Sequence, residues 1–329
     1  MMTTDTRALE TYTQLMSANG AAQIYRAAQQ AGLLQALGSG PASAAAVAQA
    51  SGTALRPTAL LLDGLRALGL LERAGEAYAL TPVARFLAGP YRDLGDAYWS
   101  HLPAFLRTGE PMARMDDPQQ SERHYQAQAQ ALAWMMAPAA EAAATALEIG
   151  GRRRGLAVLD VGAGAAVWSL ALARRDAATA VTALDWPAVL TIAQKAAAAA
   201  GLQERFTTIA GDYHKVPLPD AAFDLAILAN VAHLETAAGN RDLFERLHRA
   251  LRPGGELAVI DVFPVQPAGV LPAALYELGL ALRTTSGRLH RSADLENWVA
   301  GAGFSESRFI PLEAPPFTMG MLLTRRNRC

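Results

Sequence analysis

The clearest indication of the fold is the segment Val158-Leu159-Asp160-Val161-Gly162-Ala163-Gly164-Ala165-Ala166. Its apolar start is typical of a buried strand, and two glycines follow just before a helical segment. Glycine lets a ligand approach the backbone closely, where the first amide groups of a helix lack partners. The stretch therefore predicts a strand, a turn and a helix of an α/β sheet, in which the turn is either a ligand site or purely structural.

Short apolar runs alternate with helical segments from residue 156 to the C-terminus, as in βαβ units on a parallel sheet. Strands are expected near residues 156–161, 180–185, 205–210, 224–230, 256–262, 306–311 and 317–324. With their intervening helices they predict a doubly wound, seven-stranded, Rossmann-like α/β domain over residues 151–329.

The first hundred residues predict a smaller, mainly α-helical domain with a winged-helix outline. Helices are expected over 21–37, from Ser43 to the Ser51-Gly52 pair, and from about Pro57, followed by two short strands around Gly75. Residues 101–150 are expected to form a helical linker that contributes to an acceptor pocket. Its long helix, from about 122 to 149, should be kinked or divided at Pro138.

A winged-helix outline also suggests DNA binding, which the charges oppose. The chain has 29 basic and 30 acidic side chains, for a formal net charge of -1, and so lacks the positive field that phosphate binding requires. Only Arg56 and Arg66 could reach DNA from the expected recognition helix, whose surface is mostly leucine. This helix is therefore expected to be buried by packing or dimerisation, and nucleic acid is not expected as a partner.

Composition and targeting signals predict a cytoplasmic protein. The chain is 51% hydrophobic and 18% charged, which suits packed cores rather than disorder. Its single cysteine, Cys329, can form no internal disulfide and no thiolate metal cluster. No metal is therefore expected. No secretory signal is recognisable at the start, and prolines interrupt the apolar stretch 262–282, so no membrane partner is expected either.

Acidic residues end three neighbouring strands of the expected sheet. Asp160 lies in the first of them, Asp185 ends the second and Asp212 follows the third, after Gly211. The carboxyl ends of parallel strands meet at one edge, so the three carboxylates should converge on one crevice. A carboxylate at the end of the second strand can accept hydrogen bonds from ribose hydroxyls, although Asp185 could also cap the following helix.

These motifs resemble the class I S-adenosylmethionine-dependent small-molecule O-methyltransferases that carry an N-terminal winged-helix dimerisation domain. The resemblance spans nearly the whole chain and rests on the three strand ends and on further motifs, which are Asp185-Trp186-Pro187, His233, Arg252-Pro253-Gly254-Gly255, Arg291-Ser292 and Ala302-Gly303-Phe304. It implies a homodimer formed through the N-terminal domain. It also implies S-adenosyl-L-methionine as cofactor and S-adenosyl-L-homocysteine as its product.

The resemblance implies roles for residues of the cofactor half. The glycine turn would lie beside the methionine part, Asp185 would bind the ribose, and Asp212 with Tyr213 would lie near the adenine. The implied cofactor-binding set is Asp160, Gly162, Gly164, Asp185, Trp186, Gly211, Asp212, Tyr213 and Asn230. A dinucleotide-binding enzyme is the alternative for the turn alone, but Val167 stands where its fingerprint requires a third small residue.

His233, just past the fourth strand, matches the catalytic histidine of the family and is expected to act as general base. Two departures concern its carboxylate partners, because Leu234 follows it directly and His290 stands where plant-type enzymes have a glutamate. Three explanations stay open: His290 assists, the acceptor needs little deprotonation, or the reaction is not O-methylation.

Acceptor contacts are expected from apolar and aromatic side chains outside the cofactor half, although each could be an ordinary core residue. They are Trp99, Phe105, Trp134, Met135, Met136, Tyr276 and Leu280. Such a wall suits a flat hydrophobic or aromatic acceptor. Arg283 could bind an acidic group of the acceptor or face solvent.

The sequence thus predicts a methyltransferase acting on a small hydrophobic, aromatic or polyketide-like acceptor, most simply by O-methylation in secondary metabolism. The alternatives are C- or N-methylation, or a non-methylating reaction on the same fold, such as decarboxylation, hydroxylation or rearrangement. A ligand-responsive regulator is the further alternative, and it rests on the winged-helix outline alone.

Overall fold

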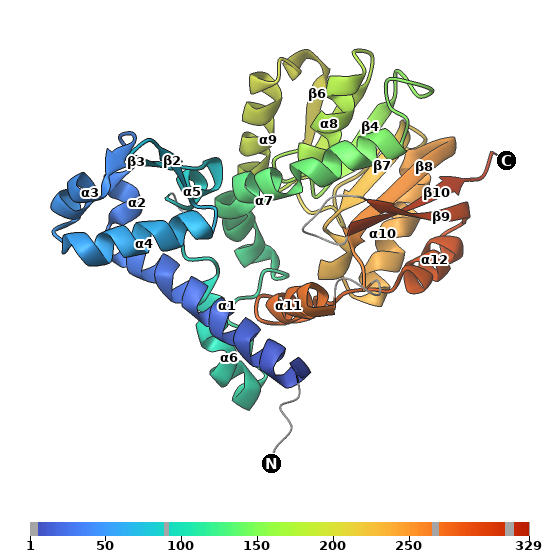
Figure 1. Ribbon diagram of the computed structural model, residues 1–329. Helices are drawn as coiled ribbons and strands as arrows, with labels where there is room; N and C mark the ends of the chain where they lie inside the picture. Colours follow the sequence, from blue (N-terminus) through green and yellow to red (C-terminus); the bar gives the residue numbers. More distant parts are fainter. Residues whose placement is uncertain (1–5, 89–91, 265–269, 313–318, 329) are drawn as a thin grey trace. The chain divides into compact units, whose positions relative to one another are not determined.

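The computed structural model describes residues 6–88, 92–264, 270–312 and 319–328. The chain divides into two compact units, Met1–Ala97 and Tyr98–Cys329 (Figure 1). Residues 101–150, expected as a linker, lie in the second unit. Within the described ranges, every helix is too short or too polar to cross a lipid bilayer.

Helices dominate the first unit, and a small sheet in the order β1-β3-β2 completes it. Its elements are α1 (Thr6–Gln30), α2 (Leu33–Ala36), β1 (Ala42–Ser43), α3 (Ala44–Ser51), α4 (Leu55–Ala67), β2 (Leu71–Ala74), β3 (Ala77–Leu80) and α5 (Pro82–Leu87). The expected helix over 21–37 is wrong in its bounds. It begins at Thr6 and is broken at Gly32, whose φ of 71° is left-handed and therefore ends the helical path.

The first unit has a core of its own. Leu62 and Leu65 of α4 are fully buried against leucines of α2 and the short strands. The expected strand pair around Gly75 is present, and Gly75 provides the positive φ that the turn requires. The leucine-rich helix therefore packs into a core on one side, while Leu55 and Leu60 stay exposed on the other.

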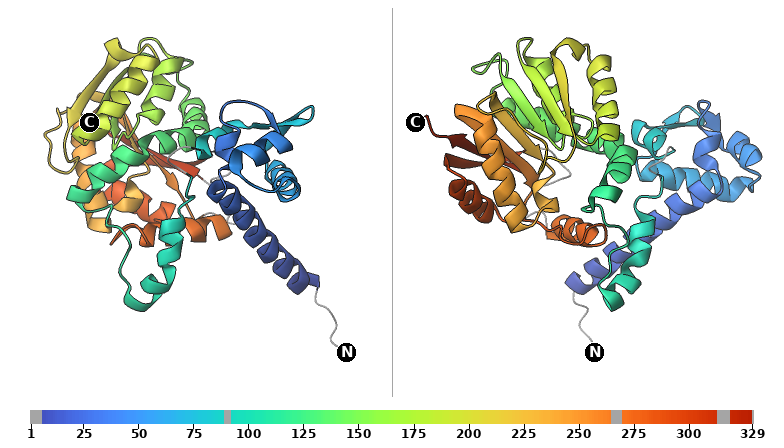
Figure 2. Two further views of the ribbon diagram at one scale, coloured as in Figure 1. Left: turned by 90° about the vertical axis from the view of Figure 1, so that its left-hand side faces the viewer. Right: turned by 180° about the vertical axis from the view of Figure 1, so that it is seen from behind.

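The second unit is built on a seven-stranded sheet in the order β6-β5-β4-β7-β8-β10-β9 (Figures 1 and 2). Its strands are β4 (Ala157–Val161), β5 (Ala180–Asp185), β6 (Phe206–Ala210), β7 (Phe223–Ala229), β8 (Leu251–Val262), β9 (Phe304–Leu312) and β10 (Met319–Arg326). The first five are parallel, and β10 runs antiparallel to both β8 and β9. All seven strands expected from the sequence are present.

Helices cover both faces of this sheet, as Figure 2 shows. The helices from residue 96 onward are α6 (Asp96–Thr108), α7 (Pro118–Ala146), α8 (Val167–Arg175), α9 (Pro187–Ala199), α10 (Ala237–Ala250), α11 (Val270–Ala281) and α12 (Ser292–Gly301), with short 3-10 turns at η1 (Gln203–Arg205) and η2 (Ala232–Leu234). Alternate strand residues face opposite cores: Val158 packs with α7 and α8, whereas Leu159 packs with α10 and α12. This two-sided burial explains the nearly continuous apolar runs.

Pro138 does not divide the long helix, which contradicts that part of the expectation. Helix α7 continues through it from Pro118 to Ala146. The alanines that follow, among them Ala140 and Ala144, are fully buried against the sheet. Tertiary burial of this face compensates for the one backbone hydrogen bond that proline cannot donate.

Candidate functional site

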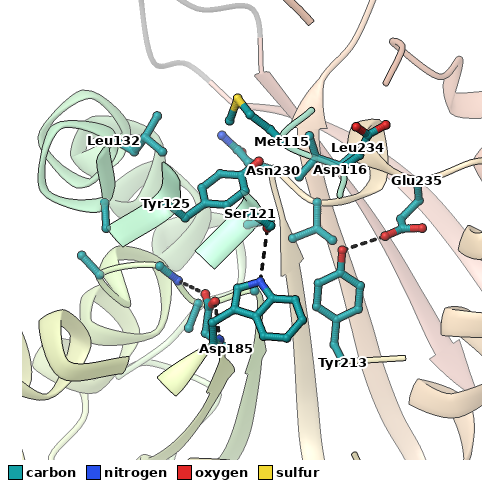
Figure 3. Close-up of a pocket in the computed structure, with 18 of the residues that line it drawn as sticks. Met115, Asp116, Ser121, Tyr125, Leu132, Asp185, Tyr213, Asn230, Leu234 and Glu235 are labelled. Atoms are coloured by element: carbon teal, nitrogen blue, oxygen red, sulfur yellow. Dashed lines mark hydrogen bonds between the residues drawn. The ribbon is translucent and has the colours of Figure 1, made fainter. Parts of the chain in front are cut away.

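A cavity of about 270 Å³ lies at the carboxyl ends of β4, β5 and β7 (Figure 3). A smaller cavity of about 160 Å³ adjoins it. Residues shared by both walls are Met115, Tyr125, Leu132, Met136, Asn230 and Leu234. The two spaces therefore form neighbouring compartments of one site in the second unit.

The glycine turn after β4 forms part of the wall of the larger cavity. Gly162 and Gly164 have φ values of 65° and 58°, in the left-handed region. A Cβ atom on Gly162 would lie 2.5 Å from Val231 Cγ2, whereas one on Gly164 would meet no atom within 4 Å. The turn thus needs Gly162 for its own packing, while Gly164 leaves open space for a ligand.

Asp185 lines the larger cavity at the end of β5 and is nearly buried. Its carboxylate accepts hydrogen bonds from the Gly164 amide at 2.8 Å and the Trp186 amide at 2.7 Å. Burial raises the pKa of Asp185 to about 6. The Gly211 amide donates to the Asp185 carbonyl at 2.9 Å, so Gly211 supports this corner from the backbone.

A cluster after β6 closes the opposite end of the larger cavity. The Tyr213 hydroxyl donates to Glu235 Oε1 at 2.6 Å (Figure 3). His214 Nε2 lies 3.0 Å from the same oxygen. The hydrogen bond with Glu235 raises the pKa of His214. Asp212 lines the cavity beside them and pairs with Lys215 at 3.0 Å.

Asn230 lies between the two cavities and lines both. It follows β7 with a φ of 58°, a conformation that asparagine tolerates better than most residues. Its Nδ2 donates to Met136 Sδ at 3.5 Å, while its buried Oδ1 has no hydrogen-bond partner. An unpaired buried acceptor costs free energy, so this oxygen is suited to a donor that a ligand brings.

Asp160, expected in the cofactor-binding set, is placed elsewhere by the structure. It is buried beneath the glycine turn, outside the residues that line either cavity, and accepts a hydrogen bond from Ser169 Oγ at 2.5 Å. Burial raises its pKa to about 7. The geometry gives Asp160 a supporting position between β4 and α8 rather than a ligand contact.

His233 lies on η2 and lines the smaller cavity, with its ring almost fully buried. Its Nδ1 is 2.6 Å from Asp261 Oδ1, and its backbone amide donates to Asp261 Oδ2 at 3.1 Å. The ring of Tyr276 meets it edge to face at 5.6 Å between centroids. A carboxylate on Nδ1 orients the imidazole and leaves Nε2 as the free base.

Asp261 is a functional residue that was not expected from the sequence. The expected partners were sought next to His233 in the chain and near His290, whereas the carboxylate comes from the C-terminal part of β8. The signal was present in the sequence. Asp261 follows Ile260 near the carboxyl end of the fifth expected strand, the same edge that the other acids indicated.

His290 does not take the position expected of a catalytic assistant. Its Nε2 lies 3.1 Å from the Glu235 carbonyl oxygen, and its ring packs edge to face on Trp298 at 5.0 Å. It is not among the residues that line the two cavities. Its contacts instead connect the segment before α12 with the segment after η2.

The structure brings some of the expected acceptor residues together. Met135, Met136, Tyr276 and Leu280 line the smaller cavity. Trp99 and Phe105 lie on α6, outside the residues that line either cavity, and Trp134 is 50% exposed on α7. In a long helix only one face can point to the cavity, so adjacent residues 134–136 cannot all do so.

A segment before α7 completes the wall. Asp116 accepts hydrogen bonds from the backbone amides of Thr285 and Ser286 and from both hydroxyls, at 2.7 to 3.0 Å. Burial alone would raise the pKa of Asp116, but these hydrogen bonds outweigh that effect and lower it. Ser121 accepts from the Trp186 indole at 3.2 Å. Sequence reasoning missed Asp116, Ser121 and Tyr125 because no strand end or motif marks them.

The two cavities differ in charge. Four carboxylates line the larger one, from Asp116, Asp185, Asp212 and Glu235, and its described wall contains no lysine or arginine. The smaller cavity has no acidic residue in its described wall, and one arginine, Arg283. A cationic ligand without phosphates therefore suits the larger compartment. In the described residues, no group of three or more His, Cys, Asp or Glu side chains could hold a metal ion.

Two family models match the chain. An O-methyltransferase domain matches residues 93–305, which is more than half of the chain, and an O-methyltransferase dimerisation domain matches residues 13–90. The chain belongs to the O-methyltransferase family.

Named relatives agree with this membership. The 3-hydroxy-5-methyl-1-naphthoate 3-O-methyltransferase of Streptomyces sahachiroi is 29% identical over 89% of this chain and 88% of its own. The acetylserotonin O-methyltransferase of Mus musculus is 31% identical over 85% of this chain and 79% of its own. The human N-acetylserotonin methyltransferase, solved in complex with SAM, shares the fold with a TM-score of 0.75, at 23% identity over 99% of this chain and 100% of its own.

Membership confirms the resemblance inferred from the motifs. The fold, the assignment as a methyltransferase enzyme, and S-adenosylmethionine as the cofactor are confirmed with it. The roles of individual residues and the identity of the acceptor are questions for the geometry of the site.

Proposed function

We propose that this enzyme transfers a methyl group from S-adenosyl-L-methionine to a hydroxyl of a small aromatic or polyketide-like acceptor in secondary metabolism. The observation that carries the proposal is the His233–Asp261 pair on the wall of an apolar cavity that adjoins an acidic one. The acidic compartment holds the cofactor, and the apolar compartment holds the acceptor.

The residues of the larger cavity fit the cofactor. Gly164 leaves space that a side chain would fill, and the Asp185 carboxylate is placed to accept from ribose hydroxyls. The unpaired Asn230 Oδ1 offers an acceptor at the boundary with the smaller cavity. When bound, S-adenosylmethionine supplies an electrophilic methyl group on a positively charged sulfur, which the surrounding carboxylates stabilise.

His233 removes the hydroxyl proton of the acceptor. With Nδ1 held by Asp261, its free Nε2 accepts that proton, and Asp261 stabilises the resulting imidazolium. The apolar walls exclude water and hold the acceptor oxygen in line with the methyl group. Orientation of this kind supplies a large share of the rate in displacement reactions.

The carboxylate beside His233 also bears on the alternatives. A missing partner for His233 was the reason to consider a reaction without methyl transfer, and Asp261 provides that partner. The apolar wall of Met135, Met136, Tyr276 and Leu280 supports an aromatic acceptor. The naphthoate and acetylserotonin enzymes, named for aromatic acceptors, support the same class.

The enzyme works as a homodimer in this proposal. Residues 13–90 match a dimerisation domain, and the first half of α1 exposes apolar side chains. Tyr12 and Leu15, for example, are 62% and 68% exposed. Burial of this surface against a second copy would remove it from water.

The direct test is transfer of label. The enzyme is incubated with S-adenosylmethionine carrying a deuterated methyl group and with a set of phenols, naphthols and hydroxylated polyketides. We expect a deuterated methoxy product, located on oxygen by tandem mass spectrometry. Label on carbon or nitrogen, or turnover of an acceptor with the cofactor unconsumed, would overturn the proposal.

A further inference from the structure

Arg283, just after α11, presents a charged side chain to the smaller cavity. Its Nε donates to the Gly279 carbonyl at 2.7 Å, and its guanidinium lies over the Tyr98 ring at 5.8 Å from the centroid. No carboxylate among the described residues forms an ion pair with it. The guanidinium is thus fixed at one nitrogen, and the described part of the chain supplies no carboxylate that pairs with it.

The groups around Arg283 do not neutralise it. The described wall of its cavity contains no acidic residue, and the phenols of Tyr125 and Tyr276 stay protonated because burial raises the pKa of each. Burial and the neighbouring Arg283 charge lower the pKa of His124. The carboxylate of Asp261 is already bound to His233. Among the described residues that line the smaller cavity, Arg283 is therefore the one side chain with a fixed charge.

A half-buried guanidinium without a counter-ion is poorly stabilised by its surroundings, and its planar fork matches a carboxylate in two parallel hydrogen bonds. We propose that Arg283 binds a carboxylate on the aromatic acceptor and thereby directs the acceptor hydroxyl toward His233. This inference rests on the proposed function, and it adds that the preferred substrates are aromatic hydroxy acids.

The test measures binding rather than turnover, so that it stands apart from the test of methyl transfer. Hydroxynaphthoates that differ in the spacing of their two groups are titrated by calorimetry into enzyme saturated with S-adenosylhomocysteine, beside the methyl esters of the same compounds. We expect at least one acid to bind about 10-fold or more tightly than its ester.

Variants assign that preference to one side chain. Arg283→Gln should weaken binding of the acid by about 10- to 100-fold and change ester binding by no more than about twofold, whereas Arg283→Lys should retain part of the preference. Arg288→Gln is the matched control, because it removes an exposed arginine of the same segment. The affinity of each variant for S-adenosylhomocysteine reports whether the site is still folded.

Equal losses for acid and ester in Arg283→Gln would overturn the inference and leave a structural role through Gly279 and Tyr98. A set in which no acid binds more tightly than its ester would overturn it as well. Methyl transfer to neutral phenols alone would contradict the acidic acceptor and leave the proposed function intact. Absence of methyl transfer, with the acid preference present, would instead contradict the proposed function.

Discussion

Asp261 holds the imidazole of His233 by one contact to its ring and one to its backbone amide. Asp261→Asn keeps the size of the side chain but loses the charge that stabilises the imidazolium. We expect turnover to fall about 100-fold or more, with S-adenosylhomocysteine affinity unchanged. Asp220→Asn, on an exposed loop, is the control. Steady-state kinetics measures turnover, and calorimetry measures the affinity for S-adenosylhomocysteine. Wild-type turnover in both variants would contradict the role assigned to Asp261.

Asp160 gives a prediction about stability and pH. Burial raises its pKa in the folded enzyme to about 7, so between about pH 4 and pH 7 the folded state holds a proton that the unfolded state has lost. Stability from this group therefore falls as pH rises, by up to about 1.4 kcal/mol per pH unit. Urea unfolding should show this contribution to the slope in the wild type and lose it in Asp160→Asn, whereas the contribution of Asp185, whose pKa is also raised, should remain. Equal pH dependence of unfolding free energy in the wild type and Asp160→Asn would contradict the raised pKa of Asp160.

Site residues at strand ends could be predicted from the sequence, whereas most site residues between helices and strands could not. Asp185, Asp212 and Asn230 line the cavity where their strands end, because parallel strands bring their carboxyl ends to one edge. Asp116 and Ser121 could not be predicted, because their positions depend on tertiary contacts with distant segments. Asp261 was predictable, because it lies near the carboxyl end of an expected strand as the other acids do.

The two glycines of the turn between β4 and α8 have different roles: Gly162 is needed for packing, and Gly164 leaves space for a ligand. Gly162→Ala places a Cβ against Val231 and should cost more than the roughly 1–2 kcal/mol of a left-handed alanine. Gly164→Ala should cost that amount alone and weaken cofactor binding about 10-fold or more, because its Cβ enters the cavity. Gly201→Ala, with similar φ and open space after α9, is the control. Unfolding and calorimetry measure both effects, and equal behaviour of the three variants would contradict the distinction.

Element order was more predictable than element bounds. The seven strands were expected because two-sided burial produces long apolar runs, as in β7, where residues 225–229 are all buried. The continuity of α7 through Pro138 was not, because local propensity opposes it and only packing on the sheet supports it. The start of α1 at Thr6 was missed because its exposed apolar residues give no core-facing stripe within the unit.

At the scale of the whole molecule, the proposed homodimer places α1 at an interface. Tyr12 and Met16 lie four residues apart on one face and are both exposed in the single chain. Replacing both by glutamate should convert a dimer to a monomer in sedimentation velocity at about 10 µM, because paired charges are costly to bury. Gln14→Glu with Ser17→Glu, on the other side of the helix, should leave the dimer intact. A monomeric wild type would contradict this assembly.

We infer that His233 is the base for methyl transfer and that the cofactor site does not depend on it. The most direct measurement is the single-turnover rate of methyl transfer from bound S-adenosylmethionine in wild type and His233→Ala, with cofactor affinity measured alongside. We predict a rate at least about 100-fold lower in the variant and an unchanged affinity. An unchanged rate would contradict the claim.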